Sequence, residues 1–148
     1  IIFFLFKKNG TKGLLVILLF ISVLILFTDQ FTNVVKDFTQ RLRPCRLDEL
    51  QGLLRDIDIR CGKYGFFSAH AANSISVTIF IINCVDESVK KFLKPVLILW
   101  VMIFSYSRIY LGVHYPLDTI FGLSFGIFSG FLFKYIYNYF ISVKVFSD

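Results

Sequence analysis

The sequence predicts an all-α polytopic bundle embedded in a membrane, and two observations carry this prediction. Hydrophobic residues make up 56% of the 148 residues, which include 19 phenylalanines, and the mean hydropathy is +0.71. These residues are also grouped into four long apolar runs, which a water-soluble domain would leave exposed. We therefore expect each long run to form a helix that crosses or enters a bilayer.

The chain begins at Ile1, inside an apolar run, without a methionine or the charged first segment of a signal peptide. We expect an N-terminally truncated chain in which residues 1–148 form a single membrane-embedded domain. The formal net charge of +6 is modest and spread over loops and helix ends. This distribution indicates anchoring at a membrane and disfavours nucleic-acid binding.

The first third of the chain predicts the tail of one span and one full span. Ile1–Phe6 is interpreted as the end of a first span. Two lysines and a turn at Asn9–Gly10 follow it. The next helix starts at Leu14 and continues to about Lys36, which gives a length of roughly 34 Å, enough to cross the apolar core. Pro44 ends the segment, because the residue before a proline avoids the helical region.

The middle of the chain predicts a polar connector and two more helices. Cys45–Phe66 is polar and contains three turn-forming glycines. Ser68 is a plausible N-cap for a helix over Ala71–Val85. Asp86–Lys94 reads as a charged loop, and the following helix is expected from Pro95, in its first turn, to about Tyr110.

The last helix is predicted from Pro116 to about Val143. Small residues recur on it at strict four-residue spacing, at Gly122, Gly126 and Gly130. This stripe should face the bundle, because small residues let helices approach closely in lipid. An interfacial belt is expected near its end, made of Lys134, Tyr135, Tyr137 and Tyr139.

Helices that alternate in direction bring several polar residues to one side of the membrane. The residues on this side are Lys36, Arg43, Ser68, His70, Arg108 and His114. Eight lysines and arginines fall on each side, so the positive-inside rule does not decide the orientation on the raw count. If Lys36, Arg43 and Arg108 serve a site, the tally becomes eight against five, which favours a site facing the periplasm or exterior.

The stretch Ser107–Asp118 has the composition of a reactive site. His114 and Asp118 are four residues apart and share a face on a helical turn. A carboxylate there can bind one imidazole nitrogen and leave the other free as a nucleophile or base. Arg108 adds a planar cation suited to phosphate or carboxylate oxygens. The alternative is a chance cluster of polar residues at a membrane surface.

Three segments resemble the signature motifs of the type 2 phosphatidic acid phosphatase (PAP2) superfamily, which shares a core with vanadium haloperoxidases. Lys36, Arg43 and Pro44 match K-x6-R-P, and Ser107, Arg108, His114 and Asp118 match S-R-x5-H-x3-D. The second motif, P-S-G-H, retains Ser68 and His70 but has Phe67 for proline and Ala69 for glycine. Ala69 still offers its backbone N–H, so the departure concerns loop geometry more than chemistry.

The resemblance implies a role for each matched residue. His114 attacks phosphorus to give a phosphohistidine, Asp118 orients it, and His70 protonates the leaving alkoxide and then activates water. The phosphate is held by Lys36, Arg43, Ser68, Ala69 and Arg108, with help from the N-terminus of a helix. No metal or other cofactor is implied, because the cations supply the charge that a metal would.

Each residue also has a plainer interpretation. Lys36 can extend from a helix end to the interface, His70 can be an interfacial capping residue, and Arg43 can be a solvated loop residue. Ser107 is an N-cap or a weak phosphate ligand. Asp29, seven residues before Lys36, is interpreted as the partner of a structural ion pair outside the site.

Cysteine positions leave two alternatives for the connector. Cys45 and Cys61 flank it and could close a loop of roughly 17 residues in an oxidising compartment, worth about 3 kcal/mol. The alternative is a pair of free thiols, because sequence does not show whether the geometry permits a bond.

The hypothesis is a lipid phosphate phosphatase of a bacterial inner membrane, acting on a phosphomonoester or diphosphate of a membrane lipid. Phosphatidic acid, phosphatidylglycerol phosphate, polyprenyl diphosphate and lipid A are the candidate substrates that the resemblance offers, with isoprenyl and glycerolipid phosphates preferred. The expected partners are the substrate and the bilayer, without nucleic acid. The alternatives are a lipid phosphotransferase using the same histidine and a non-catalytic transporter, which would need charges at mid-span.

Overall fold

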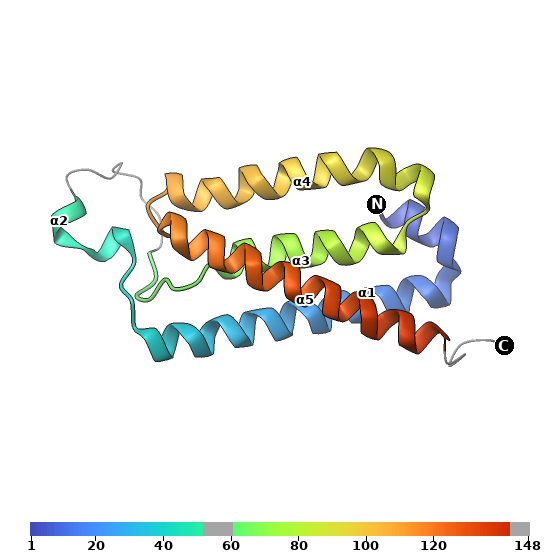
Figure 1. Ribbon diagram of the computed structural model, residues 1–148, viewed down its shortest axis with the longest axis horizontal. Coiled ribbons are helices and arrows are strands. Elements are labelled where there is room, and N and C mark those ends of the chain that lie inside the picture. Colours follow the sequence, from blue (N-terminus) through green and yellow to red (C-terminus); the bar gives the residue numbers. More distant parts are fainter. Residues whose placement is uncertain (52–60, 143–148) are drawn as a thin grey trace.

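A computed structural model of the chain describes residues 1–51 and 61–142. In chain order, its helices are α1 (Ile2–Thr39), the short 3-10 helix η1 (Pro44–Arg46), α2 (Asp48–Gln51), α3 (Ala69–Cys84), α4 (Glu87–Tyr110) and α5 (Pro116–Ser142) (Figure 1). Within the described ranges, the only β-type pairing is an isolated antiparallel bridge between Leu42 and Tyr64. The predicted all-α bundle is confirmed.

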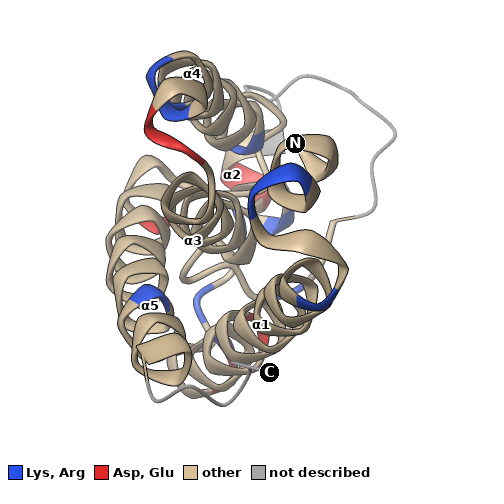
Figure 2. Cartoon of the chain, turned by 90° about the vertical axis from the view of Figure 1, so that its right-hand side faces the viewer, with Lys and Arg blue, Asp and Glu red and all other residues tan. Residues whose placement is uncertain are grey.

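Three of the described helices, α1, α4 and α5, are long and apolar enough to cross a membrane. The fourth long element, α3, has 16 residues and rises only about 24 Å. Viewed along the bundle, α3 lies in the centre with α1, α4 and α5 around it (Figure 2). Because protein covers much of α3, the helix can carry buried hydroxyls such as Ser74 and Ser76, each of which donates to a carbonyl three residues back. The chain is an integral membrane protein.

The stripe of small residues on α5 faces α3, as predicted. Gly122, Gly126 and Gly130 are all buried. A Cβ atom at Gly122 would lie 2.5 Å from the Ser68 carbonyl oxygen, and one at Gly130 would lie 2.9 Å from the Ser76 carbonyl oxygen. The four-residue stripe therefore lets the two backbones approach so closely that a methyl group would not fit.

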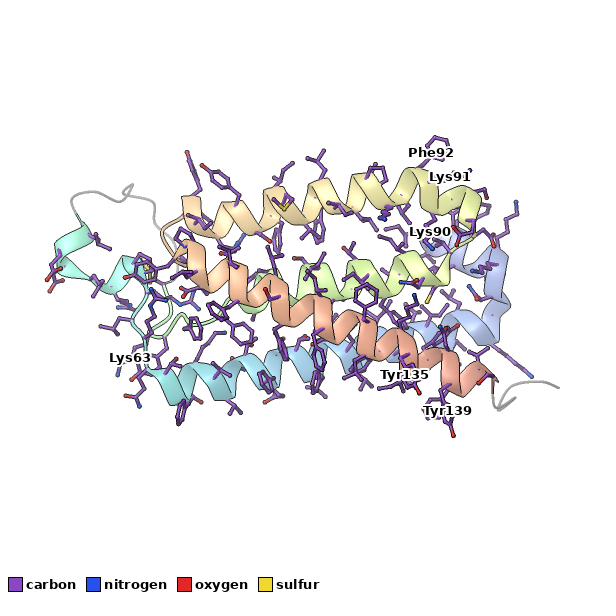
Figure 3. The ribbon with its side chains drawn as sticks, in the orientation of Figure 1. Lys63, Lys90, Lys91, Phe92, Tyr135 and Tyr139 are labelled. Atoms are coloured by element: carbon purple, nitrogen blue, oxygen red, sulfur yellow. A yellow bond between two sulfur atoms is a disulfide. The ribbon has the colours of Figure 1, made fainter. Side chains whose placement is uncertain are left out.

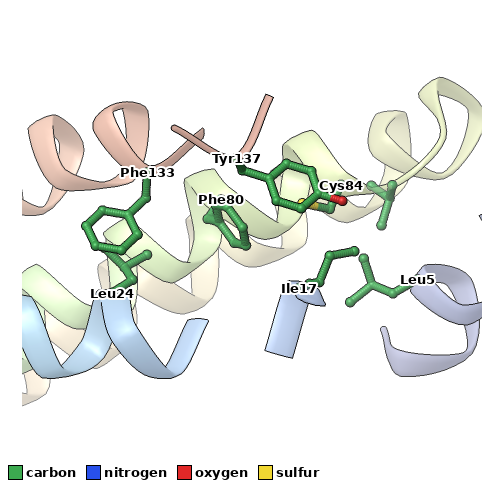
Figure 4. Packing of buried hydrophobic residues seen from close by; sticks show 8 residues of the cluster. Leu5, Ile17, Leu24, Phe80, Cys84, Phe133 and Tyr137 are labelled. Atoms are coloured by element: carbon green, nitrogen blue, oxygen red, sulfur yellow. The ribbon is translucent and has the colours of Figure 1, made fainter. Parts of the chain in front are cut away.

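The hydrophobic core fills the half of the bundle that contains the C-terminal end of α3 (Figure 4). It is built from α1, α3 and α5, with Leu5, Ile17, Leu24, Phe80, Cys84, Phe133 and Tyr137 buried. The prediction of Tyr137 as part of an interfacial belt is wrong, because its ring packs edge-on against Phe20 and Phe80. Tyr135 and Tyr139 remain exposed near that end of the bundle (Figure 3).

The predicted turn at Asn9–Gly10 appears as a sharp bend inside α1. Gly10 has φ 67° and ψ −174°, a conformation that a side chain disfavours. The bend folds the first turns of α1 over the end of α3, where Lys8 Nζ donates to the Val85 carbonyl and Asn9 Nδ2 to the Cys84 carbonyl. A cation at a helix C-terminus also suits the helix dipole.

The predicted start of the fourth helix at Pro95 is wrong. α4 begins at Glu87, two turns earlier, so Pro95 lies inside the helix. An acidic residue in the first turn favours a helix start, and Lys90 Nζ pairs with the Glu87 carboxylate at 2.9 Å. The proline removes one backbone hydrogen bond, a loss that membrane-spanning helices tolerate.

Candidate active site

The residues of the three motifs meet at the end of the bundle where α1 and α4 finish and α3 and α5 begin (Figure 1). Lys63 lies at this end of the bundle, whereas Lys90 and Lys91 lie at the opposite end (Figure 3). His70, in the first turn of α3, is within electrostatic range of Lys36, Arg43, Arg108 and His114. The convergence expected from alternating helices therefore brings both histidines and three cations to one place.

The first motif leaves α1 through a left-handed residue. Gln40 has φ 48° and ψ 25°, and its N–H binds the Lys36 carbonyl oxygen at 2.9 Å. This places Lys36 in the last turn of α1, half-buried and on the site side. The chain then extends, and residues 41–43 run antiparallel to residues 63–65.

Arg43 is fixed by backbone carbonyls of two segments. Its Nε donates to the Tyr64 carbonyl at 2.9 Å, and one terminal nitrogen donates to the Val113 carbonyl at 3.4 Å. A Cβ at Gly65 would lie 3.0 Å from Arg43 Cγ, so the missing side chain gives the arginine room. Burial lowers the pKa of the guanidinium and the Asp118 carboxylate opposes this shift, but arginine remains a cation throughout.

The second motif forms the start of α3. Ser68 is fully buried and is the N-cap that the sequence predicts, since its Oγ accepts from the Ala71 N–H at 3.4 Å. The Ser68 N–H donates to the Asp118 backbone carbonyl at 2.9 Å, which ties α3 to α5. The helix starts at Ala69, and the N–H groups of a first helical turn point out of the helix toward any anion placed there.

His114 and Asp118 form a buried couple between α4 and α5. Their exposed fractions are 2% and 0%, and His114 Nδ1 lies 3.6 Å from Asp118 Oδ2. The Tyr115 N–H donates to the same carboxylate oxygen at 2.9 Å. Burial lowers the pKa of His114, and Arg43 and Lys36 lower it further, whereas Asp118 raises it. The net effect is a neutral imidazole whose Nδ1 faces a carboxylate.

Arg41 is a site residue that the sequence analysis missed. Its terminal nitrogen pairs with Asp118 Oδ1 at 2.9 Å, and its guanidinium lies 4.3 Å from the Tyr115 ring centroid. The available signal was its spacing from Arg43, because residues two apart in an extended segment point to the same face. Arg41 therefore holds the carboxylate that faces His114.

The third cation, Arg108, lies in the last turn of α4. Its guanidinium lies 4.8 Å from the Phe104 ring centroid, and its Nε donates to Ser107 Oγ at 3.2 Å. Ser107 Oγ itself donates to the Phe104 carbonyl at 2.6 Å. The N-cap interpretation of Ser107 is wrong, because the residue lies near the C-terminal end of α4, where its Oγ accepts from Arg108.

Asp29 does not pair with Lys36 in the described structure. Its Oδ1 instead accepts from Asn73 Nδ2 at 2.7 Å, which links α1 to α3. The predicted structural ion pair is wrong because α3 places an amide one turn below His70. The Asp29 carboxylate lines a cavity together with His70.

The connector carries a disulfide between Cys45 and Cys61. Arg46 donates to the Cys61 carbonyl at 2.6 Å, and the Cys45 N–H donates to the Gly112 carbonyl at 3.0 Å. These contacts attach the start of the connector to the loop that carries His114. Much of the connector, residues 52–60, lies outside the described ranges.

Comparisons with known proteins place the chain in a family. The profile of the PAP2 superfamily matches residues 13–142. A lipid A 4'-phosphatase of Bacteroides thetaiotaomicron is 37% identical over 139 residues, which cover 92% of this chain and 60% of that protein. A lipid A 4'-phosphatase of Porphyromonas gingivalis is 34% identical, over 93% of this chain and 58% of that protein. The chain thus spans about three fifths of the length of these relatives.

A solved structure shares the fold. It is the transmembrane PAP2 type phosphatidylglycerolphosphate phosphatase of Bacillus subtilis, which superposes with a TM-score of 0.70 at 23% identity. The similarity covers 97% of this chain and 66% of that one. The likeness extends over all the helices described above.

Proposed function

Because this chain belongs to the PAP2 superfamily, we propose that it is a lipid phosphate phosphatase that works through a phosphohistidine intermediate. The observation that carries the proposal is the buried couple of His114 and Asp118, which lies within electrostatic range of His70 among three cations. A phosphoryl group carries charge on three oxygens, and its transfer is catalysed mainly by positioning and electrostatic stabilisation. Lys36, Arg43 and Arg108 supply that stabilisation.

In the first step, His114 Nε2 attacks phosphorus and the bond to the lipid oxygen breaks. The Nδ1 proton faces Asp118, which stabilises the positive charge that the ring acquires. Protonated His70 gives its proton to the leaving alkoxide, so the lipid alcohol departs neutral. The N-terminus of α3, at Ala69, contributes N–H groups to the phosphate oxygens.

In the second step, water completes the cycle. His70, now neutral, takes a proton from a water molecule, which attacks phosphorus and breaks the bond to His114. Inorganic phosphate leaves, and both histidines regain their starting protonation states. The reaction consumes one water and needs no redox partner.

The substrate we propose is a lipid phosphate whose headgroup reaches this end of the bundle. The names of the two bacterial relatives support lipid A as the first substrate to test, ahead of the isoprenyl and glycerolipid phosphates that the sequence analysis preferred. Phosphatidic acid, phosphatidylglycerol phosphate and polyprenyl diphosphate complete the panel.

The test is phosphate release from this panel by the purified protein in detergent. The wild type should release inorganic phosphate from at least one lipid, and His114→Ala should release none. Formation of a new phosphoester in place of free phosphate would indicate the phosphotransferase instead. No turnover of any lipid by the folded wild type would contradict the proposal.

The roles of the two histidines are tested with a substrate whose leaving group needs no protonation, such as nitrophenyl phosphate. His70→Ala should lose about 10²–10⁴ in rate on a lipid phosphate but recover much of the first step on this substrate. Acid-labile phosphate should then accumulate on His70→Ala, because the water that clears it lacks its base. Label on His114→Ala would show that the roles are reversed.

We further propose that the protein lies in a bacterial inner membrane with this site facing outward. In this proposal four of the eight lysines and arginines that the sequence count assigns to the site side serve the phosphate or Asp118, which leaves four against the eight lysines counted on the other side. A cysteine introduced at Glu49, in α2, should react with a membrane-impermeant thiol reagent in intact cells. One introduced at Lys91, at the far end (Figure 3), should not; the reverse pattern would place the site in the cytoplasm.

A further inference from the structure

Beside His70, a cavity of about 430 Å³ extends along α3, the helix that α1 and α4 flank. Its polar lining comes from His70, Asn73 and Ser74 on α3 and from Asp29 on α1. The Ser74 hydroxyl already donates to the Ala71 carbonyl. Trp100 and Phe104 line it from α4, with their rings stacked 5.2 Å apart between centroids. The cavity therefore has His70, the proposed proton donor, on one part of its lining and an apolar wall of Trp100 and Phe104 on another.

The polar part of this cavity has hydrogen-bonding capacity to spare. Asn73 Nδ2 donates to Asp29 Oδ1 at 2.7 Å, and the side-chain oxygen Oδ1 of Asn73 accepts from the Thr28 hydroxyl. A carboxylate has about four acceptor sites, of which Asn73 occupies one. An ionisable group inside a membrane span is costly, and such groups commonly bind substrates or ions. The two-step reaction proposed above does not use Asp29.

The register of α3 relates this pair to the reaction. His70 and Asn73 are three residues apart, so they share a face with Asn73 about 4.5 Å deeper along the helix. The leaving oxygen of the substrate must lie against His70 when it receives its proton. If the leaving group occupies this cavity, the atoms bonded to that oxygen extend toward Asn73 and Asp29, and hydrocarbon beyond them meets Trp100 and Phe104.

We propose that this cavity holds the alcohol portion of the lipid phosphate, and that Asp29 and Asn73 select alcohols with a hydrogen-bond donor near the phosphoester. The donor would be a hydroxyl or amide N–H within a few bonds of the leaving oxygen, and the Asp29 carboxylate would accept from it. This inference rests on the proposed phosphatase function and adds the substrate class that the site prefers. A site built to bind such a donor discriminates strongly against an analogue that lacks it.

Two lipids with matched size test this preference. Ceramide 1-phosphate has a hydroxyl and an amide N–H next to its phosphoester, whereas phosphatidic acid has two chains but only ester oxygens there. The wild type should show kcat/KM at least about tenfold higher for ceramide 1-phosphate, the effect of a hydrogen bond to a charged group. Asp29→Asn, which keeps the shape of the side chain, should remove most of that ratio. Glu87→Gln, a carboxylate-to-amide change at the far end, should leave it intact.

The outcomes separate this inference from the proposed function. If the ratio of the two kcat/KM values is unchanged in Asp29→Asn, whether or not both values fall, the carboxylate only joins α1 to α3. If Asp29→Asn does not fold, Asp29→Ser provides the same comparison. A wild type that prefers phosphatidic acid, or uses neither lipid while hydrolysing others of the panel, would overturn the inference alone. Failure of the whole panel would overturn the proposed function as well.

Discussion

At the scale of single residues, Asp118 is the group around which the site is arranged. Its carboxylate binds Arg41 and the Tyr115 N–H and faces His114, while its backbone carbonyl accepts from the Ser68 N–H. A fully buried carboxylate is costly unless it is paired and hydrogen-bonded. Arg41 provides that pairing and so fixes the orientation of the carboxylate.

Arg41→Gln should therefore reduce kcat by about 10–100-fold with little change in KM, the effect of losing a hydrogen bond between charged groups. KM should hold because Arg41 faces Asp118 and not the phosphate in this mechanism. Arg41→Lys should recover part of the loss, and Arg46→Gln, which alters an exposed arginine in η1, should resemble the wild type. A rise in KM with unchanged kcat would instead assign Arg41 to substrate binding.

The buried environment of His114 predicts an acid-tolerant first step. Burial lowers its pKa from the ordinary value near 6.5, so the neutral ring, the form that the proposed mechanism needs, persists as the pH falls below that value. The unfolded chain binds this proton at a higher pH than the folded chain. The contribution of neutral His114 to the free energy of unfolding is therefore complete above about pH 6.5, and it is lost as the pH falls through the folded-state pKa.

The measurement is the pH dependence of phosphoenzyme formation in His70→Ala with nitrophenyl phosphate, which isolates His114. The rate should stay level from neutral pH to below about 6.5 and then fall. A decline centred at or above that value would contradict the effect of burial.

Most of the motif residues were predictable from sequence because their chemistry is tied to fixed spacing. The contacts of Arg41 and Asp29 were not. Arg41 pairs with a residue 77 positions away, and Asp29 with one 44 positions away. Such pairings depend on how helices dock, and local sequence does not contain that information. The sequence therefore predicts a structural ion pair for Asp29, whereas the structure gives it the amide of Asn73 as a partner.

At the scale of elements, helix ends were predicted well where a local signal marks them, as at Ser68, Tyr110 and Pro116. Pro95 was misread because its local preference for a first turn is outweighed by the helix-forming residues before it. Tyr137 was misread because a tyrosine near a helix end suits either an interface or a core. Only the packing of Phe20 and Phe80 decides between them.

The contact between α3 and α5 predicts a cost for any side chain on the glycine stripe. Gly126→Ala would place a methyl group against the Ala72 backbone carbonyl and the Ile75 side chain. The Ala72 backbone cannot move away without disturbing α3, so the added methyl group should lower the free energy of unfolding by about 1–3 kcal/mol. Thermal unfolding in detergent measures this, and Ser124→Thr, which adds a methyl group on the exposed face of α5, should leave the unfolding temperature close to that of the wild type. An equal loss in both variants would contradict the close approach.

At the scale of the whole molecule, the Cys45–Cys61 disulfide joins the two ends of the connector. The loop it closes has a sequence separation of 16, for which the chain-entropy model gives about 3 kcal/mol. Cys45→Ser/Cys61→Ser should lower the free energy of unfolding by about that amount, and reductant should have the same effect on the wild type alone. Both thiols recovered free after trapping under non-reducing conditions would remove this source of stability.

The glycine contact between α3 and α5 has a consequence for how such an enzyme can diversify. It holds the start of α3, which carries His70, against the first turns of α5, so the spacing of His70 and Asp118 depends on this helix pair. The cavity beside His70 has its other walls on α1 and α4, through Asp29, Trp100 and Phe104. Substitutions on those walls can reshape the space for the lipid while the reacting atoms keep their spacing. Under the proposals above, a change in lipid preference can thus arise at Asp29 on α1 or Trp100 on α4 while the contact between α3 and α5 is retained.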